Sequence, residues 1–130
     1  MKASVEIIRK WAKIYNDELH VYKPEHYAHI EKICSLLDYE ELPEDAGIFA
    51  WLIAEDFNCK KRMNVVILYC KQEYRGRYLR YMMRRIEEIA KQEGCFDIII
   101  GHSVSGYKED KYDKMLSYFG YKPNGYNKEV

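Results

Sequence analysis

The chain has 130 residues, which is long enough for one domain with a hydrophobic core that needs neither disulfides nor metal. Lysine plus arginine equals aspartate plus glutamate, 21 each, so the formal net charge is zero, which argues against a general nucleic-acid or membrane-surface binder. The four cysteines form no CxxC pair and have no histidine at metal-ligand spacing, which predicts reduced thiols, no metal site and a cytoplasmic protein.

The first part of the chain predicts a short strand followed by two helices. Apolar residues within Ser4–Ile8 fit a first strand, but the apolar positions up to Leu19 also fit one helical face, and we favour the strand followed by helix. A second helix is predicted from Pro24 to Leu37, because a proline in the first helical turn has no N–H to leave unpaired.

Two apolar strands joined by a turn are predicted in the middle of the chain. The strands are Ile48–Ala54 and Val65–Tyr69, and Phe57–Arg62 has the composition of a hairpin turn. Both runs are continuously apolar instead of alternating, which is typical of strands covered on both faces. We therefore expect an α/β protein with three layers, in which helices lie on both sides of a central sheet.

An amphipathic helix follows the second of these strands, after a charged turn at Arg75-Gly76. Gly94 lies where a C-terminal helix glycine is expected. The first N–H groups of such a helix lack partners inside it, so a strand, a turn and a helix in this order predict an anion-binding site. The apolar positions recur at the three-and-four spacing of one helical face: Leu79, Met82, Met83, Ile86, Ile89 and Ala90.

The rest of the chain predicts a strand, a helix and a final short strand. These are Cys95–Gly101, Glu109–Phe119 and Tyr126–Val130. The first of them should run parallel to the strand that precedes the long helix, through a right-handed crossover. His102 follows its carboxyl end, where open α/β sheets place their chemistry, so it is a candidate catalytic residue.

The residues Glu73-Tyr74-Arg75-Gly76 resemble the acetyl-CoA-binding segment of the GNAT superfamily of N-acetyltransferases. In that family an apolar strand leads into V-x-P-E-Y-R-G-x-G-x-G and then into a long helix. The resemblance continues through DIIIG at Asp97–Gly101 and YDKMLSYFGY at Tyr112–Tyr121, which is similar to the family's last helix ending in Gly-Phe. It implies one domain over residues 1–130, with a mixed central sheet, two splayed parallel strands and helices on both faces.

The resemblance also implies how acetyl-CoA would bind. The pantetheine arm would pair with the backbone of Leu68, Tyr69 and Cys70, and the phosphates would lie on the N–H groups and guanidinium groups of the following turn. This chain has Tyr78 and Arg80 where the family has glycines, and their side chains would crowd the approach of a pyrophosphate. The residues implied for the phosphates are Arg75, Gly76, Arg77, Tyr78, Leu79 and Arg80.

The activity implied by the resemblance is direct transfer of an acetyl group from a thioester to an amine. Such a reaction needs a base for the amine, for which Glu55 or Asp56 is predicted, and an acid for the leaving thiolate. The family's catalytic tyrosine corresponds to Leu116 here, and Tyr112, one helical turn earlier, is the predicted replacement.

Two other functions stay open. The same fold could act without catalysis as a binding or assembly module, similar to degenerate GNAT-like proteins of bacterial viruses, and would then be found in the virion. Alternatively, the arginines and tyrosines of Arg75–Arg85 could bind single-stranded nucleic acid, although the neutral net charge argues against it. For an enzyme, the expected partner is a small-molecule or protein amine, and 13 tyrosines are compatible with a homodimer or an assembly partner. No membrane span is predicted, because no apolar run approaches the ~20 residues required.

Overall fold

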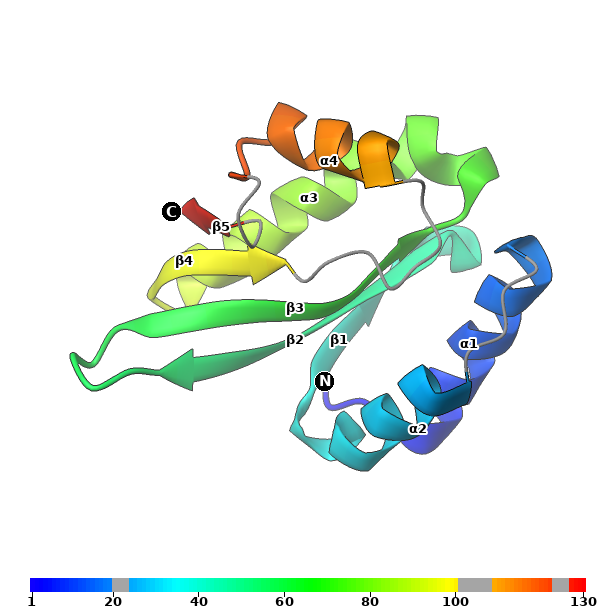
Figure 1. Ribbon diagram of the computed structural model, residues 1–130, viewed down its shortest axis with the longest axis horizontal. Helices are drawn as coiled ribbons and strands as arrows, with labels where there is room; N and C mark the ends of the chain where they lie inside the picture. The colour runs from blue at the N-terminus through cyan, green and yellow to red at the C-terminus, as the bar shows by residue number, and fades with distance from the viewer. Residues whose placement is uncertain (20–23, 101–108, 123–126) are drawn as a thin grey trace.

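A computed structural model describes residues 1–19, 24–100, 109–122 and 127–130 (Figure 1). Its centre is a five-stranded sheet in the order β1-β2-β3-β4-β5, with helices on both faces. The helices are α1 (Val5–Leu19), α2 (Pro24–Ile33), α3 (Arg75–Gln92) and α4 (Glu109–Tyr118), and the strands are β1 (Asp38–Glu41), β2 (Gly47–Glu55), β3 (Lys61–Cys70), β4 (Cys95–Ile100) and β5 (Asn127–Glu129).

The sheet is mixed, as predicted. The pairs β1–β2, β2–β3 and β4–β5 are antiparallel, whereas β3 and β4 are parallel and are connected through α3. Parallel neighbours need such a crossover, because a tight turn cannot return the chain to the same end of the sheet. The three-layer α/β prediction is therefore confirmed.

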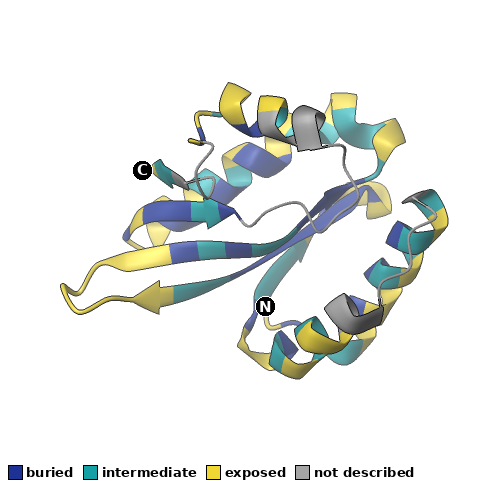
Figure 2. Cartoon of the chain, viewed as in Figure 1, coloured by how far each residue is buried: buried dark blue, intermediate teal, exposed yellow. Residues whose placement is uncertain are grey.

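The sheet is buried or half-buried on both faces over residues 47–51 and 65–70, which explains the continuous apolar runs there, whereas the hairpin end of β2 and β3 is exposed (Figure 2). On one face, Phe49 and Trp51 stack with ring centroids 5.4 Å apart and pack in the same core cluster as residues of α3 and α4. On the other face, Trp11 and Tyr15 of α1 meet the ring of Tyr69 edge-on, at 6.1 and 5.4 Å. β3 is thus held between two layers of helices.

The predicted first strand at Ser4–Ile8 is wrong, because α1 already begins at Val5. The Ser4 hydroxyl accepts a hydrogen bond from the Ile7 N–H at 3.3 Å, which is the bond of a helix N-cap. From there, Ile8, Trp11 and Tyr15 are all buried at the spacing of one helical face. The N-terminus meets the edge of the sheet through an isolated bridge between Lys2 and Asp38.

The edge strand β1 was not predicted, and the second helix is shorter than expected. α2 ends at Ile33, one turn of 3-10 helix follows, and β1 then occupies Asp38–Glu41 with three acidic residues among its four. Its sequence lacks the apolar signal of a strand, because Tyr39 is its one apolar residue and packs against the core. β2 pairs along one edge of β1, and in the described residues the other edge carries the bridge from Lys2 to Asp38. Charged side chains on such an edge discourage pairing with other chains.

The remaining elements lie close to their predicted positions. β3 begins earlier than expected, at Lys61, because the hairpin turn is tight: the Asp56 carboxylate accepts the N–H groups of Asn58 and Lys60 at 2.8 and 3.0 Å. Gly94 follows α3 with φ of 71°, as a C-terminal helix glycine does. In the part of the chain that the structure describes, no helix is long and apolar enough to cross a membrane.

Two glycines near the end of β3 should respond in opposite ways to an added methyl group. A Cβ on Gly47 would lie 2.3 Å from the Tyr69 carbonyl oxygen, whereas a Cβ on Gly76 would meet no atom within 4 Å. We expect Gly47→Ala to lower the free energy of unfolding by about 1–3 kcal/mol. Gly76→Ala should leave it unchanged or raise it by up to about 1 kcal/mol.

Denaturant unfolding followed by the fluorescence of the buried Trp11 and Trp51 measures both effects. Equal destabilisation by the two substitutions would contradict the packing described for these glycines.

Candidate functional site

The candidate site begins where β3 extends past its parallel neighbour (Figure 1). The pairing of β3 with β4 runs from Lys61 opposite Cys95 to Val65 opposite Ile100. β3 then continues through Val66–Cys70, and within the described ranges no strand pairs with this segment on the side away from β2. This segment is where the sequence predicted that two parallel strands part.

The direction of the backbone groups in this segment follows from one hydrogen bond. The Lys71 N–H donates to the Ala46 carbonyl at 2.8 Å, so the backbone of Lys71 faces the β2 side. Because successive residues of a strand direct these groups to opposite sides, Tyr69 also faces β2, whereas Leu68 and Cys70 face the β4 side. The Cys70 carbonyl already accepts a hydrogen bond from the Arg75 guanidinium, so Leu68 is the residue that can offer backbone groups to a ligand there. Tyr69 cannot, which corrects the prediction that all three would.

The N-terminus of α3 lies just beyond the end of β3. One turn of 3-10 helix, Gln72–Tyr74, separates Cys70 from the first helical residue, Arg75. The first turn of α3 contains no acidic residue, and no side chain of the described residues caps its N–H groups. The Arg75 N–H donates to the Gln72 carbonyl of the preceding turn, so an anion at this terminus would be held by the N–H groups that follow and by the helix dipole.

Gly76 leaves open space in this first helical turn. The residue is exposed, its φ is not positive, and an added Cβ would touch nothing within 4 Å. Neither backbone conformation nor internal packing therefore requires a glycine at this position. A glycine disfavours helix relative to alanine by roughly 0.5–1 kcal/mol, so its presence is explained best by the close approach of something outside the chain.

The three arginines predicted to surround the phosphates point in different directions. The Arg75 guanidinium turns inward, donating to the Cys70 carbonyl at 3.0 Å and lying 3.7 Å from the Glu18 carboxylate. Arg77 pairs with Glu44 at 3.4 Å. Arg80 donates to the Tyr118 hydroxyl of α4 at 3.0 Å. The structure thus does not gather these side chains into one clasp, and the anion site consists mainly of backbone N–H groups.

Tyr78 lies at one of the expected glycine positions, and its hydroxyl is directed away from β4. It donates to the Glu44 carboxylate at 2.9 Å, on the loop before β2, and β2 lies on the opposite side of β3 from β4. This hydrogen bond is the main reason that the pKa of Tyr78 is raised. Leu79, the next residue, is half-buried against the core, so only its backbone is available to a ligand.

The Cys70 thiol is fully buried on the face covered by α3. Burial raises its pKa to about 11, although the nearby Arg75 opposes the shift. At neutral pH the group is therefore a protonated thiol, and the thiolate is the nucleophilic form of cysteine. Cys70 therefore offers no reactive sulfur, and its carbonyl is already bonded to Arg75.

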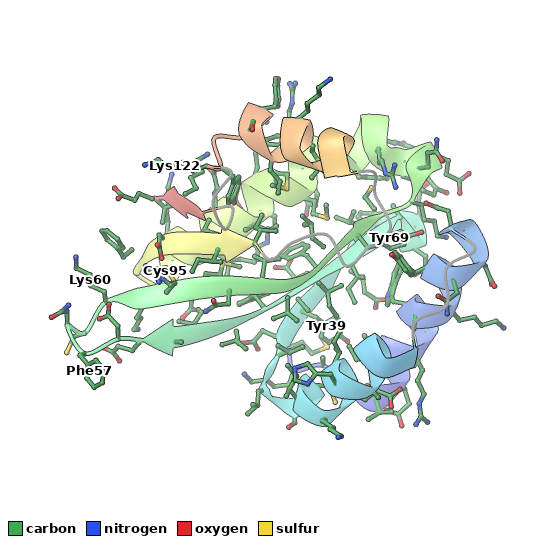
Figure 3. All side chains as sticks on the ribbon, viewed as in Figure 1. Tyr39, Phe57, Lys60, Tyr69, Cys95 and Lys122 are labelled. Carbon is green, nitrogen blue, oxygen red and sulfur yellow. The ribbon has the colours of Figure 1, made fainter. Side chains whose placement is uncertain are left out.

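Glu55 is not brought to the site, which corrects its prediction as the catalytic base. It pairs with Lys61 at the hairpin end of the sheet, nine residues along β3 from Cys70, or about 30 Å. Figure 3 shows this separation, with Phe57 and Lys60 at one end of the β2–β3 hairpin and Tyr69 towards the other. Asp56 lies in the hairpin turn and is equally distant.

The other catalytic candidates are placed only in part. α4 spans Tyr112, but the Tyr112 side chain and all of His102 lie outside the described residues. Leu116, at the position of the family's tyrosine, is fully buried in the core.

Two carboxylates that contact the site were not among the residues predicted from the sequence. Glu18, near the end of α1, accepts the Gln72 N–H at 3.2 and 3.3 Å, and Glu44 holds Tyr78. Neither carboxylate belongs to a motif. Their partners lie 54 and 34 residues away in the chain, so no local pattern indicates either contact.

No family model and no curated protein matches the sequence, but solved structures match the fold. An acetyltransferase of Trypanosoma brucei covers 95% of this chain and 92% of its own at 12% identity, with a TM-score of 0.63. Glucosamine-6-phosphate N-acetyltransferase of Arabidopsis thaliana covers 95% and 90% at 15% identity, with a TM-score of 0.61. An aminoglycoside acetyltransferase from an uncultured soil sample covers 100% and 91% at 13% identity, with a TM-score of 0.63. Together with the parted strands and the helix that follows them, these similarities show that the chain has the fold of the GNAT acetyltransferases.

Proposed function

We propose that the protein is a cytoplasmic, acetyl-CoA-dependent N-acyltransferase that acetylates an amine. The observation that carries this proposal is Gly76, a glycine at the open end of a helix with no structural need to be one. An uncapped helix terminus favours an anion, and the missing Cβ lets that anion approach the backbone closely. The backbone of β3 directed to the β4 side provides pairing groups for an extended chain next to it.

The proposal assigns most of the binding to the backbone. The N–H groups of Gly76 and Arg77 would hold the cofactor phosphates, and the backbone of Leu68 would pair with the pantetheine arm. Bound acetyl-CoA supplies the acetyl group as a thioester. An N–H of β3 near its carbonyl oxygen would stabilise the negative charge that develops there as the amine attacks.

The buried thiol of Cys70 favours direct transfer over an acyl-enzyme. As a protonated group without solvent access, it would neither attack the thioester nor release the acetyl group to the acceptor. The incoming amine would then form its bond to the carbonyl carbon while the bond to the CoA sulfur breaks. The amine nitrogen loses one proton as the amide forms, and the departing sulfur gains one. Tyr112 stays the predicted donor to the sulfur, with His102 a second candidate, and the donor would regain its proton from the amine through solvent.

A second candidate function is the same fold without catalysis, as a binding or assembly module. The observation in its favour is the buried Leu116, because an aliphatic side chain at this position cannot give a proton to a thiolate. The two functions differ in turnover, while acetyl-CoA binding is required only by the first.

The first test is the binding of acetyl-CoA. At about one hundred times its dissociation constant, the ligand should raise the unfolding free energy by roughly 2.7 kcal/mol. Gly76→Ala should weaken binding about tenfold without lowering the stability of the free protein, because the methyl group meets only the ligand. Gln92→Ala, at the far exposed end of α3, is the matched control. A wild-type protein whose stability does not change with acetyl-CoA would reject the proposal.

The second test concerns the mechanism. Mass spectrometry of the protein after incubation with acetyl-CoA at neutral pH should find no acetyl group on Cys70, and Cys70→Ala should retain turnover. The pKa of about 11 means that a thiolate accumulates only at strongly alkaline pH, so any labelling of this residue should rise with pH. An acetylated Cys70 at pH 7 would contradict direct transfer.

The third test concerns the proton donor. With acceptor amines such as glucosamine 6-phosphate or an aminoglycoside, which match the names of two structural neighbours, Tyr112→Phe should lower kcat by 10²-fold or more, of the order expected for general acid catalysis. The dissociation constant of acetyl-CoA should not change, because the proton is needed only in the reaction. Unchanged turnover would remove Tyr112 from the mechanism.

A further inference from the structure

Tyr78 occupies a place where its ring could block the anion site. It lies in the first turns of α3, two residues after Gly76. Side chains on a helix lean towards its N-terminus, so an unrestrained ring at this position would lie across the first N–H groups. An amide terminus that accepts an anion therefore needs this ring to be held aside.

Several contacts hold the ring in one position. The hydroxyl donates to Glu44 at 2.9 Å, the ring lies 6.0 Å from that of Tyr74, and the Arg77 guanidinium lies 5.4 Å from its centroid. Arg77 also pairs with the same carboxylate of Glu44. The hydroxyl bond is the directional contact among these, because it fixes the side of β3 to which the ring points.

The loop that carries Glu44 is in an unusual conformation. Glu44 and Asp45 both have left-handed backbones, with φ of 62° and 51°, which is uncommon for residues with a Cβ. Contacts hold the loop at both ends: Asp45 pairs with Lys10 at 3.0 Å, and the Leu42 N–H donates to the Gly47 carbonyl at 2.8 Å. Backbones of this kind persist where the surroundings require them, often beside functional sites.

We infer that Glu44 is a positioning residue that holds the Tyr78 ring away from the α3 N-terminus. The phosphates of the cofactor can then reach the N–H groups there. This role rests on the proposed function. The negative charge of Glu44 should have the opposite effect, because a carboxylate near an anion site weakens anion binding. The two effects predict opposite results when Glu44 is removed.

The test is the dissociation constant of acetyl-CoA, measured by calorimetry for a set of variants that are first checked to be folded at the temperature of the measurement. Glu44→Ala and Tyr78→Phe each break the hydroxyl bond and should weaken binding roughly tenfold. Glu44→Gln keeps an acceptor for the hydroxyl and should bind close to wild type. Tyr78→Gly removes the ring and should bind at least as well as wild type, and adding Glu44→Ala to it should cause no further loss.

The inference is overturned if Glu44→Ala binds acetyl-CoA as tightly as wild type or more tightly, or if it weakens binding equally with and without the Tyr78 ring. Dependence on the ring separates positioning from a general structural role. If wild type fails to bind but Tyr78→Gly binds, the ring blocks the site and the inference alone is wrong. If neither binds, the proposed function itself fails, and the inference with it.

Discussion

A β-strand that extends past its parallel neighbour leaves backbone N–H and C=O groups that must find partners, and the architecture of the site depends on this constraint. In β3, the alternation fixed by the Lys71–Ala46 bond sends every second residue's groups towards the β4 side. The same end of β3 leads within a few residues into α3, whose first N–H groups also lack partners in the helix. The segment of β3 that can pair with an extended ligand therefore lies next to the helix terminus that can bind an anion. This combination suits a long ligand with a charged end.

The cores on the two faces of the sheet make this arrangement rigid. α3 packs over one face through residues such as Met82 and Ile86, while α1 covers the other through Trp11 and Tyr15. β3 lies between them with Tyr69 turned to one side and Cys70 to the other. The buried thiol is a consequence of this packing, so the same alternation that aims the Cys70 backbone at the site removes its sulfur from the chemistry.

The sequence predicted the parts of the fold that are set by local pattern. The apolar runs of β2 and β3, the helical face of α3 and the turn at Gly94 all follow from residues next to one another in the chain. It failed for Ser4–Ile8, where the strand and helix patterns overlap and an N-cap decided the outcome, and for β1, where three acidic residues leave Tyr39 as the one apolar residue. At the site, the motif identified Gly76 but not Glu44, because that contact depends on the tertiary fold. Glu55 was misplaced because its charge was considered without its position at the far end of the hairpin.

The most direct test of the proposed site is a titration of ¹⁵N-labelled protein with acetyl-CoA, in which the chemical shifts of the backbone amides are measured. We expect the signals of Leu68 and Gly76 to move strongly, the signal of Tyr69 to move less because its N–H faces β2, and the signal of Glu55 not to move. Shifts that are as large for Tyr69 as for Leu68, shifts centred on the hairpin end, or no shifts at all would contradict the proposed site.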